Sequence, residues 1–261
     1  MTQAHQVVEF LADVEKRFEQ FCVTFNTEQS IEKNAYDCPI GPVRSAIFRG
    51  DVFEKASAVY CDLNIDTPPV LAEKMGWTGM KMQGLVLEIG IHPRNPRIPK
   101  GYIELRANVG DSVILAGGTD IFPYFYNDDD RIFFANKIRD LCEKHTVDYE
   151  ELRNIRADFF KSNFRKCDVG YHAGIYSFHL DEKKFPFFME MADAFFTAYG
   201  ELVTKRNVEP YSESDRETQL KLHGQWAEWI MVEDEGTRFG LVKGIPPEAL
   251  LGAILPPVAT F

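Results

Sequence analysis

The chain has 261 residues, of which 45% are hydrophobic and 26% charged, and its net charge is −11 at pH 7. This length and composition predict one globular domain over residues 1–261. The acidic balance excludes non-specific nucleic-acid binding, which needs clustered lysine and arginine. No apolar run is long enough to span a bilayer, and the N-terminus has no signal-type apolar core, so we expect a cytoplasmic protein.

The first half of the chain predicts one long helix followed by strands. Apolar residues at helical spacing indicate a helix over residues 3–25, and Thr2 stands where it can cap the start. Residues 43–64 alternate as a strand pair with Gly50 at the turn, whereas 75–83 fits no pattern. Further strands are predicted at 84–91, 101–109 and 111–116.

The second half is mainly helical. Helices are predicted at residues 128–145, 147–164, 185–206, 212–223 and 247–253, and strands at 174–180, 226–232 and 239–242. Strands and helices do not alternate regularly, so a doubly wound parallel sheet is excluded. The fold class we expect is α+β, with an antiparallel sheet covered by helices.

Histidines and cysteines give no metal signal. The number of cysteines is odd and no CxxC occurs, which argues against a disulfide framework and against a zinc site. His172 and His179 have an odd spacing, which on a strand sends their side chains to opposite faces. We therefore expect no metal centre.

The most informative segment runs from His92 to Asp120. Three prolines stiffen its start, and Gly117-Gly118 allows a tight turn or a close approach to a ligand. Asp120 follows in an apolar run, where a buried carboxylate needs a cation, water or a ligand. Arg106 is the nearest upstream cation that strand pairing can bring beside it. The alternatives are an Asp120 that caps a turn and a His92 that merely pins a loop.

These motifs resemble the oxygen-dependent coproporphyrinogen III oxidases. The resemblance rests on His92-Pro93-Arg94-Asn95-Pro96, on Arg106 in a strand, on Gly117-Gly118-Thr119-Asp120, and on shorter matches such as Asp234-Glu235-Gly236-Thr237-Arg238. It implies a single broad antiparallel sheet with helices on both faces, a cleft between sheet and helices, and a homodimer.

The resemblance also implies an activity. The enzyme type oxidatively decarboxylates a propionate side chain on a pyrrole, with molecular oxygen as co-substrate and no metal or organic cofactor. Asp120 is expected to bind or deprotonate the ring N–H, Arg106 to bind a carboxylate, and Tyr102 to replace a family histidine as hydrogen bonder. The full expected set of catalytic and substrate-binding residues is Asp120, Arg106, His92, Tyr102, Gly117, Gly118, Asn95, Ser45 and Arg238.

The chain also departs from the family pattern in ways that lower its positive charge. Where the family has Asp-Arg-Gly-Thr, for example, this chain has Glu235 in place of the arginine. A substrate with four propionates needs several cations, because unpaired anions are costly to bury. Two alternatives therefore stay open: a smaller, less anionic pyrrole or indole acid as substrate, and a non-catalytic protein that binds a tetrapyrrole or another aromatic ligand.

Overall fold

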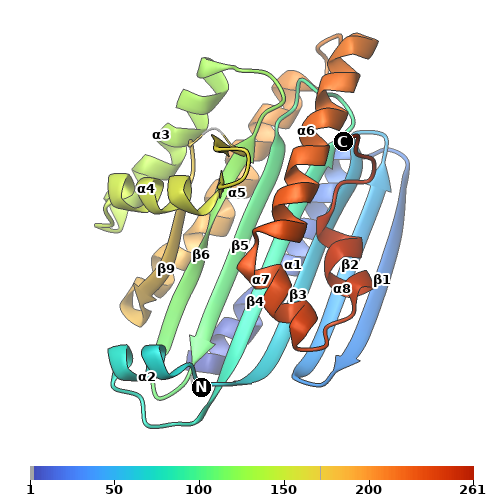
Figure 1. Ribbon diagram of the computed structural model, residues 1–261. Coiled ribbons are helices and arrows are strands. Elements are labelled where there is room, and N and C mark those ends of the chain that lie inside the picture. The colour runs from blue at the N-terminus through green and yellow to red at the C-terminus, as the bar shows by residue number, and fades with distance from the viewer. Residues whose placement is uncertain (1–2, 171) are drawn as a thin grey trace.

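A seven-stranded antiparallel sheet dominates the computed structural model, which describes residues 3–170 and 172–261 (Figure 1). Its strand order is β1-β2-β3-β4-β5-β6-β9. The strands are β1 (Gln29–Cys38), β2 (Gly41–Gly50), β3 (Phe53–Asp66), β4 (Lys81–Pro93), β5 (Lys100–Val109), β6 (Val113–Phe122) and β9 (Ile175–Asp181), and β7 (Lys161–Ser162) pairs with β8 (Cys167–Asp168) in a separate ribbon. The predicted α+β class is confirmed.

Helices cover both faces of the sheet (Figure 1). One face carries α1 (Gln3–Phe25) and α5 (Phe185–Arg206), and α3 (Asp128–Lys144) packs against α5. The other face carries α6 (Glu213–Val232), α7 (Glu235–Val242) and α8 (Pro247–Ile254), while α4 (Tyr149–Phe159) packs on β9. Short helices α2 (Pro69–Met75) and η1 (Glu182–Lys184) complete the described chain.

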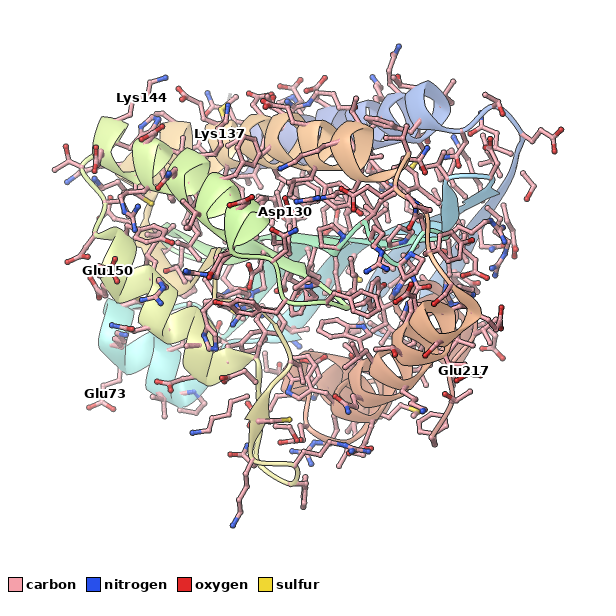
Figure 2. The ribbon with its side chains drawn as sticks, turned by 90° about the horizontal axis from the view of Figure 1, so that it is seen from above. Glu73, Asp130, Lys137, Lys144, Glu150 and Glu217 are labelled. Atoms are coloured by element: carbon pink, nitrogen blue, oxygen red, sulfur yellow. The ribbon has the colours of Figure 1, made fainter. Side chains whose placement is uncertain are left out.

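The view from above separates these layers (Figure 2). Asp130, labelled there at the start of α3, accepts hydrogen bonds from Arg206 of α5 at 2.7 and 2.8 Å. Apolar side chains divide into two main clusters, one under α1 and α5 and one under α6–α8. The second cluster is the aromatic-rich one that borders the candidate site.

Two predicted strands are helical in the structure. Residues 226–232 complete α6 and residues 239–242 belong to α7. Trp226, Trp229 and Ile230 are buried against the sheet at helical spacing. The strand prediction was wrong because so short an apolar run fits the two-residue period of a strand as well as the 3.6-residue period of a helix. Strand β1 was missed because it is an exposed edge strand with no hydrophobic alternation. The predicted cap Thr2 lies outside the described residues.

Candidate functional site

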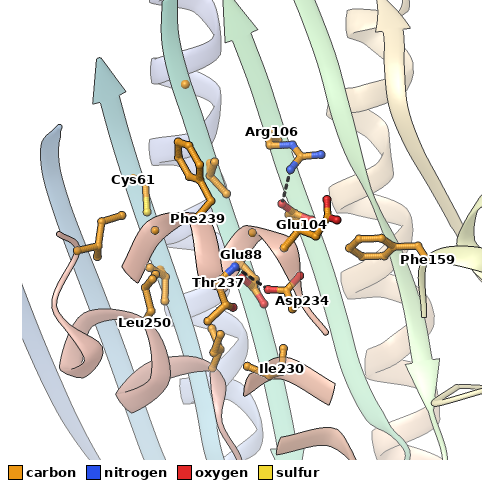
Figure 3. A pocket seen from close by; sticks show the side chains of 18 of the residues that line it. Cys61, Glu88, Glu104, Arg106, Phe159, Ile230, Asp234, Thr237, Phe239 and Leu250 are labelled. Carbon is orange, nitrogen blue, oxygen red and sulfur yellow. Dashed lines mark hydrogen bonds and ion pairs between the residues drawn. The ribbon is translucent and has the colours of Figure 1, made fainter. Parts of the chain in front are cut away.

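A cavity of about 540 Å³ lies between the sheet and helices α6–α8. Strands β3, β4 and β5 form its floor, and Phe159, Tyr176 and Phe178 close one side. Figure 3 shows Arg106 and Glu104 on the floor, Phe159 to one side, and Asp234, Thr237 and Phe239 on the covering helix. Two indole rings, those of Trp226 and Trp229, also line it. The predicted cleft between sheet and helices is therefore present and has aromatic walls.

Arg106 supplies the guanidinium group that lines this cavity. It lies on β5, and its Nη1 atom is 3.7 Å from Oε1 of Glu104. Burial lowers the pKa of Arg106, but the surrounding groups Glu104, Tyr176, Tyr102 and Asp234 together outweigh that effect and leave the pKa raised. The buried Nε atom of Arg106 has no hydrogen-bond partner among the described residues. Arg106 is thus always charged and keeps donors for a ligand carboxylate.

Glu104 accepts hydrogen bonds from two tyrosines. The hydroxyl of Tyr176 donates to Oε2 at 2.6 Å, and that of Tyr102 donates to the same atom at 3.2 Å. Burial and then the Glu104 charge raise the pKa of both hydroxyls well above the ordinary value, so both tyrosines stay protonated donors. Tyr102 lines the cavity, as expected, and its role there is to donate a hydrogen bond to Glu104.

Acidic groups outnumber cations along the cavity. Among the described lining residues, Arg106 is the sole lysine or arginine, whereas six are acidic: Glu88, Glu104, Asp158, Glu233, Asp234 and Glu235. The buried amine of Lys100 does not line this cavity, because it lies behind Trp226, with Nζ 2.7 Å from the ring centre. Glu235, which stands where the resembling family has an arginine, is one of these lining residues.

Glu88 gives a testable pH dependence. Burial, followed by the charges of Glu104 and Asp234, raises the pKa of Glu88 well above its ordinary value. A carboxyl with a raised folded-state pKa contributes stability below its unfolded pKa of about 4.3 and loses that contribution as pH rises through the folded value. Between pH 5 and pH 8 the wild type should therefore lose more stability than Glu88→Gln. Urea unfolding at both pH values measures this, and equal losses would contradict it.

Asp120 does not share the cavity with Arg106. Strand register places Tyr102 opposite Asp120, and Arg106 opposite Ala116, so the two charged groups are separated along the sheet. Asp120 is fully buried, forms an ion pair with Arg156 of α4, and accepts backbone hydrogen bonds from Ile121 and Gly174, each at 2.8 Å. The expectation that Asp120 lies at the cleft wall beside Arg106 is therefore wrong.

Four other expected site residues also lie away from the cavity lining. His92 is fully buried, and its ring meets that of His223 of α6 at 5.2 Å between centroids. Asn95 donates to the carbonyls of Asn207 and Glu209 at 3.2 and 2.9 Å, beyond the C-terminal end of α5. Ser45 is buried on β2. Asn95 therefore holds the loop, whereas neither ring nitrogen of His92 has a hydrogen-bond partner among the described residues. Arg238 is exposed on α7, outside the lining.

Gly117 and Gly118 lie within β6, where the sequence suggested either a tight turn or a close approach to a ligand. Gly117 has φ of +113°, beside a register shift between β6 and β9. A Cβ on Gly118 would lie 2.0 Å from the carbonyl oxygen of Ile175, so the neighbouring strand needs a glycine there. Neither glycine lines the cavity; the close approach that they permit is between strands.

This packing predicts different outcomes for two glycine substitutions. Gly118→Ala should lower the free energy of unfolding by about 1–3 kcal/mol, because strand β9 must move. Gly90→Ala is the matched control: it is also a buried strand glycine, but a Cβ there meets nothing within 4 Å. Urea unfolding of both variants measures the difference. A stable Gly118→Ala protein would show that β9 is not held so closely.

The chief residues that sequence reasoning missed are Glu88 and the aromatic residues of α6. Glu88 lies in an apolar strand with no motif around it. It can be recognised as a site residue only from its pairing with Glu104 across β4 and β5. Trp226 and Trp229 were assigned to a strand. Tyr176 was assigned correctly to a strand but without a role, since its hydrogen bond to Glu104 spans 72 positions of sequence.

Two further findings bear on the class of site. Among residues 3–170 and 172–261, no group of three or more histidine, cysteine, aspartate or glutamate side chains has an arrangement that could hold a metal ion. None of the helices in the same ranges combines the length and apolar character needed to cross a membrane. Cys61 lines the cavity, and burial raises the pKa of its thiol to about 12, so it is uncharged.

Comparisons with known proteins agree with the resemblance seen in the motifs. The family model described as coproporphyrinogen III oxidase matches residues 6–261. A protein of Francisella philomiragia named oxygen-dependent coproporphyrinogen-III oxidase is 29% identical over 227 residues, which cover 81% of this chain and 72% of that protein. Proteins of the same name from Francisella tularensis subspecies mediasiatica and tularensis are 28% and 29% identical, with the same coverage.

Proposed function

The chain belongs to the coproporphyrinogen III oxidase family, and from that premise we propose that it is an oxygen-dependent oxidoreductase of this type. The reaction converts a propionate side chain on a pyrrole ring into a vinyl group. The side chain loses carbon dioxide together with a proton and two electrons. Dioxygen takes up the two electrons and two protons and becomes hydrogen peroxide, so the overall reaction consumes one proton.

The observation that carries this proposal is the position of Arg106 in a ring-lined cavity. A propionate can reach the guanidinium while its pyrrole lies against Tyr176, Phe159 or the indoles. Helices α6–α8 cover the sheet face, which limits access of water to the ring. Binding and orientation are the tasks that these side chains can perform, and dioxygen supplies the oxidising power.

The proposal includes no metal and no organic cofactor. It also includes a homodimer in the cytoplasm, as the family resemblance implies. Light scattering coupled to size-exclusion chromatography tests the dimer, and activity after exhaustive chelation tests the independence from metal. A monomer that is fully active would remove the dimer from the proposal without affecting the chemistry.

A second candidate substrate is favoured by the charge balance of the cavity. One arginine faces six acidic side chains, so the lining offers few partners for a tetracarboxylate. A smaller pyrrole or indole acid with a single carboxylate needs only Arg106. The reaction would be the same.

The test is an aerobic and an anaerobic incubation with coproporphyrinogen III and, separately, with a monopyrrole that carries one propionate. Mass spectrometry counts the carboxyl groups lost, and an electrode records oxygen uptake. Decarboxylation that requires oxygen supports the oxidase, and the preferred compound decides between the two substrates. Tight binding without oxygen uptake for either compound would favour the non-catalytic binder instead.

A further inference from the structure

Two carboxyl groups face each other on the floor of the cavity. Glu88 of β4 and Glu104 of β5 are direct partners in the strand register, so their side chains leave the same face of the sheet side by side. Asp234, at the N-cap of α7, approaches them from the covering layer (Figure 3). A concentration of acidic groups inside a ring-lined cavity needs donors to offset the cost of burial.

Protein donors satisfy only part of this cluster. The two tyrosine hydroxyls occupy Oε2 of Glu104, but its Oε1 atom faces the Arg106 guanidinium at 3.7 Å, longer than a hydrogen bond. Asp234 accepts the backbone N–H of Thr237 at 2.8 Å. No hydrogen bond or ion pair joins the Glu88 carboxyl to any other residue in the described ranges. The Oε1 atom of Glu104 and the carboxyl group of Glu88 are thus left to form hydrogen bonds with a ligand.

A second, independent observation also points to a ligand. Trp226 is 5% exposed and lines the cavity, yet its indole N–H has no hydrogen-bond partner among the described residues. The buried Nε of Arg106 also lacks a hydrogen-bond partner. Of the buried polar atoms without a hydrogen-bond partner in the described residues, two thus belong to residues that line this cavity together with the open carboxyl groups.

We propose that Glu104, assisted by Glu88, accepts the ring N–H of the substrate while Arg106 holds the substrate's carboxylate. This inference rests on the proposed function and names the residues that recognise the ring. The ligand class is an electron-rich N–H heterocycle with a carboxylate arm. A carboxylate that accepts the N–H hydrogen bond raises electron density on the ring, which favours its oxidation by dioxygen. Asp120 cannot take this part, because Arg156 covers it.

Two matched probes test the N–H contact without turnover. Indole-3-propionate carries both the N–H and the carboxylate, and 1-methylindole-3-propionate lacks only the N–H. Calorimetry should find that the wild type binds the first probe about tenfold more tightly, the value of one hydrogen bond to a charged group. In Glu104→Gln the ratio should fall to less than about threefold, and Glu88→Gln should lower it as well. Circular dichroism checks that each variant is folded.

Two control variants separate this contact from general charge effects. Glu217→Gln removes the same charge from an exposed acid of α6, outside the cavity lining, and should leave the ratio unchanged. Arg106→Met should weaken both probes equally. Equal affinity of the probes in the wild type, failure of both probes to bind, or a ratio that survives Glu104→Gln would each overturn the proposal. A wild-type affinity ratio of about tenfold together with no oxygen uptake would contradict the proposed oxidase activity but would still support this binding site.

Discussion

Replacing Arg106 with methionine should lower kcat/KM for the carboxylate substrate about 100-fold, which corresponds to roughly 2.7 kcal/mol. The guanidinium is the sole lysine or arginine side chain in the described cavity lining, so no neighbour can substitute for it. Removing it also leaves Glu104 without its nearest cation. Steady-state oxygen uptake measures the loss.

Two further variants make the Arg106 result specific. Arg238→Gln removes an exposed guanidinium from α7, outside the cavity lining, and should leave kcat/KM within about twofold of the wild type. Arg106→Lys keeps the charge but loses the two-pronged geometry, so it should recover only part of the activity. An Arg106→Met enzyme with unchanged kcat/KM would remove the anchor from the proposed mechanism.

Asp120→Asn should destabilise the protein by about 3 kcal/mol, because it leaves Arg156 as an uncompensated buried charge. Both side chains of this pair are fully buried. Burial raises the pKa of Asp120, and the Arg156 guanidinium with two backbone donors opposes that rise. Urea unfolding at pH 7 measures the change in the free energy of unfolding.

An exposed ion pair serves as the control for Asp120. Lys137 and Glu201 join α3 and α5 at 3.2 Å with both side chains largely exposed, and Lys137→Met should change stability by less than about 1 kcal/mol. An Asp120→Asn protein that keeps its stability but loses preference for the N–H probe would return Asp120 to the role that the sequence motif suggested.

The sheet and most helices could be predicted because their patterns are local. The helix over 3–25, the hairpin at Gly50 and the strands around 84–116 follow from apolar periodicity and turn residues alone. The errors at 226–232 and 239–242 arose where a few apolar residues fit both periods, and only packing against the sheet decides between them. Strand β1 carries no burial signal that a pattern could detect.

The candidate site was predictable only in part, since its members meet through pairing across strands. Arg106 and Tyr102 were identified from a motif and do line the cavity. Asp120 came from the same motif, but α4 supplies Arg156 to cover it, and sequence spacing does not reveal that contact. Glu88 and Glu104 become partners through the β4–β5 register, which the loop between the strands sets.

A structure with bound coproporphyrin III, the oxidised and unreactive ring, tests the central geometry most directly. We predict that the ring lies between β3–β5 and helices α6–α8, with one carboxylate on Arg106 and a ring N–H facing Glu104. A ring bound elsewhere, or one whose N–H groups face Asp120 after displacement of Arg156, would contradict the site described for this chain.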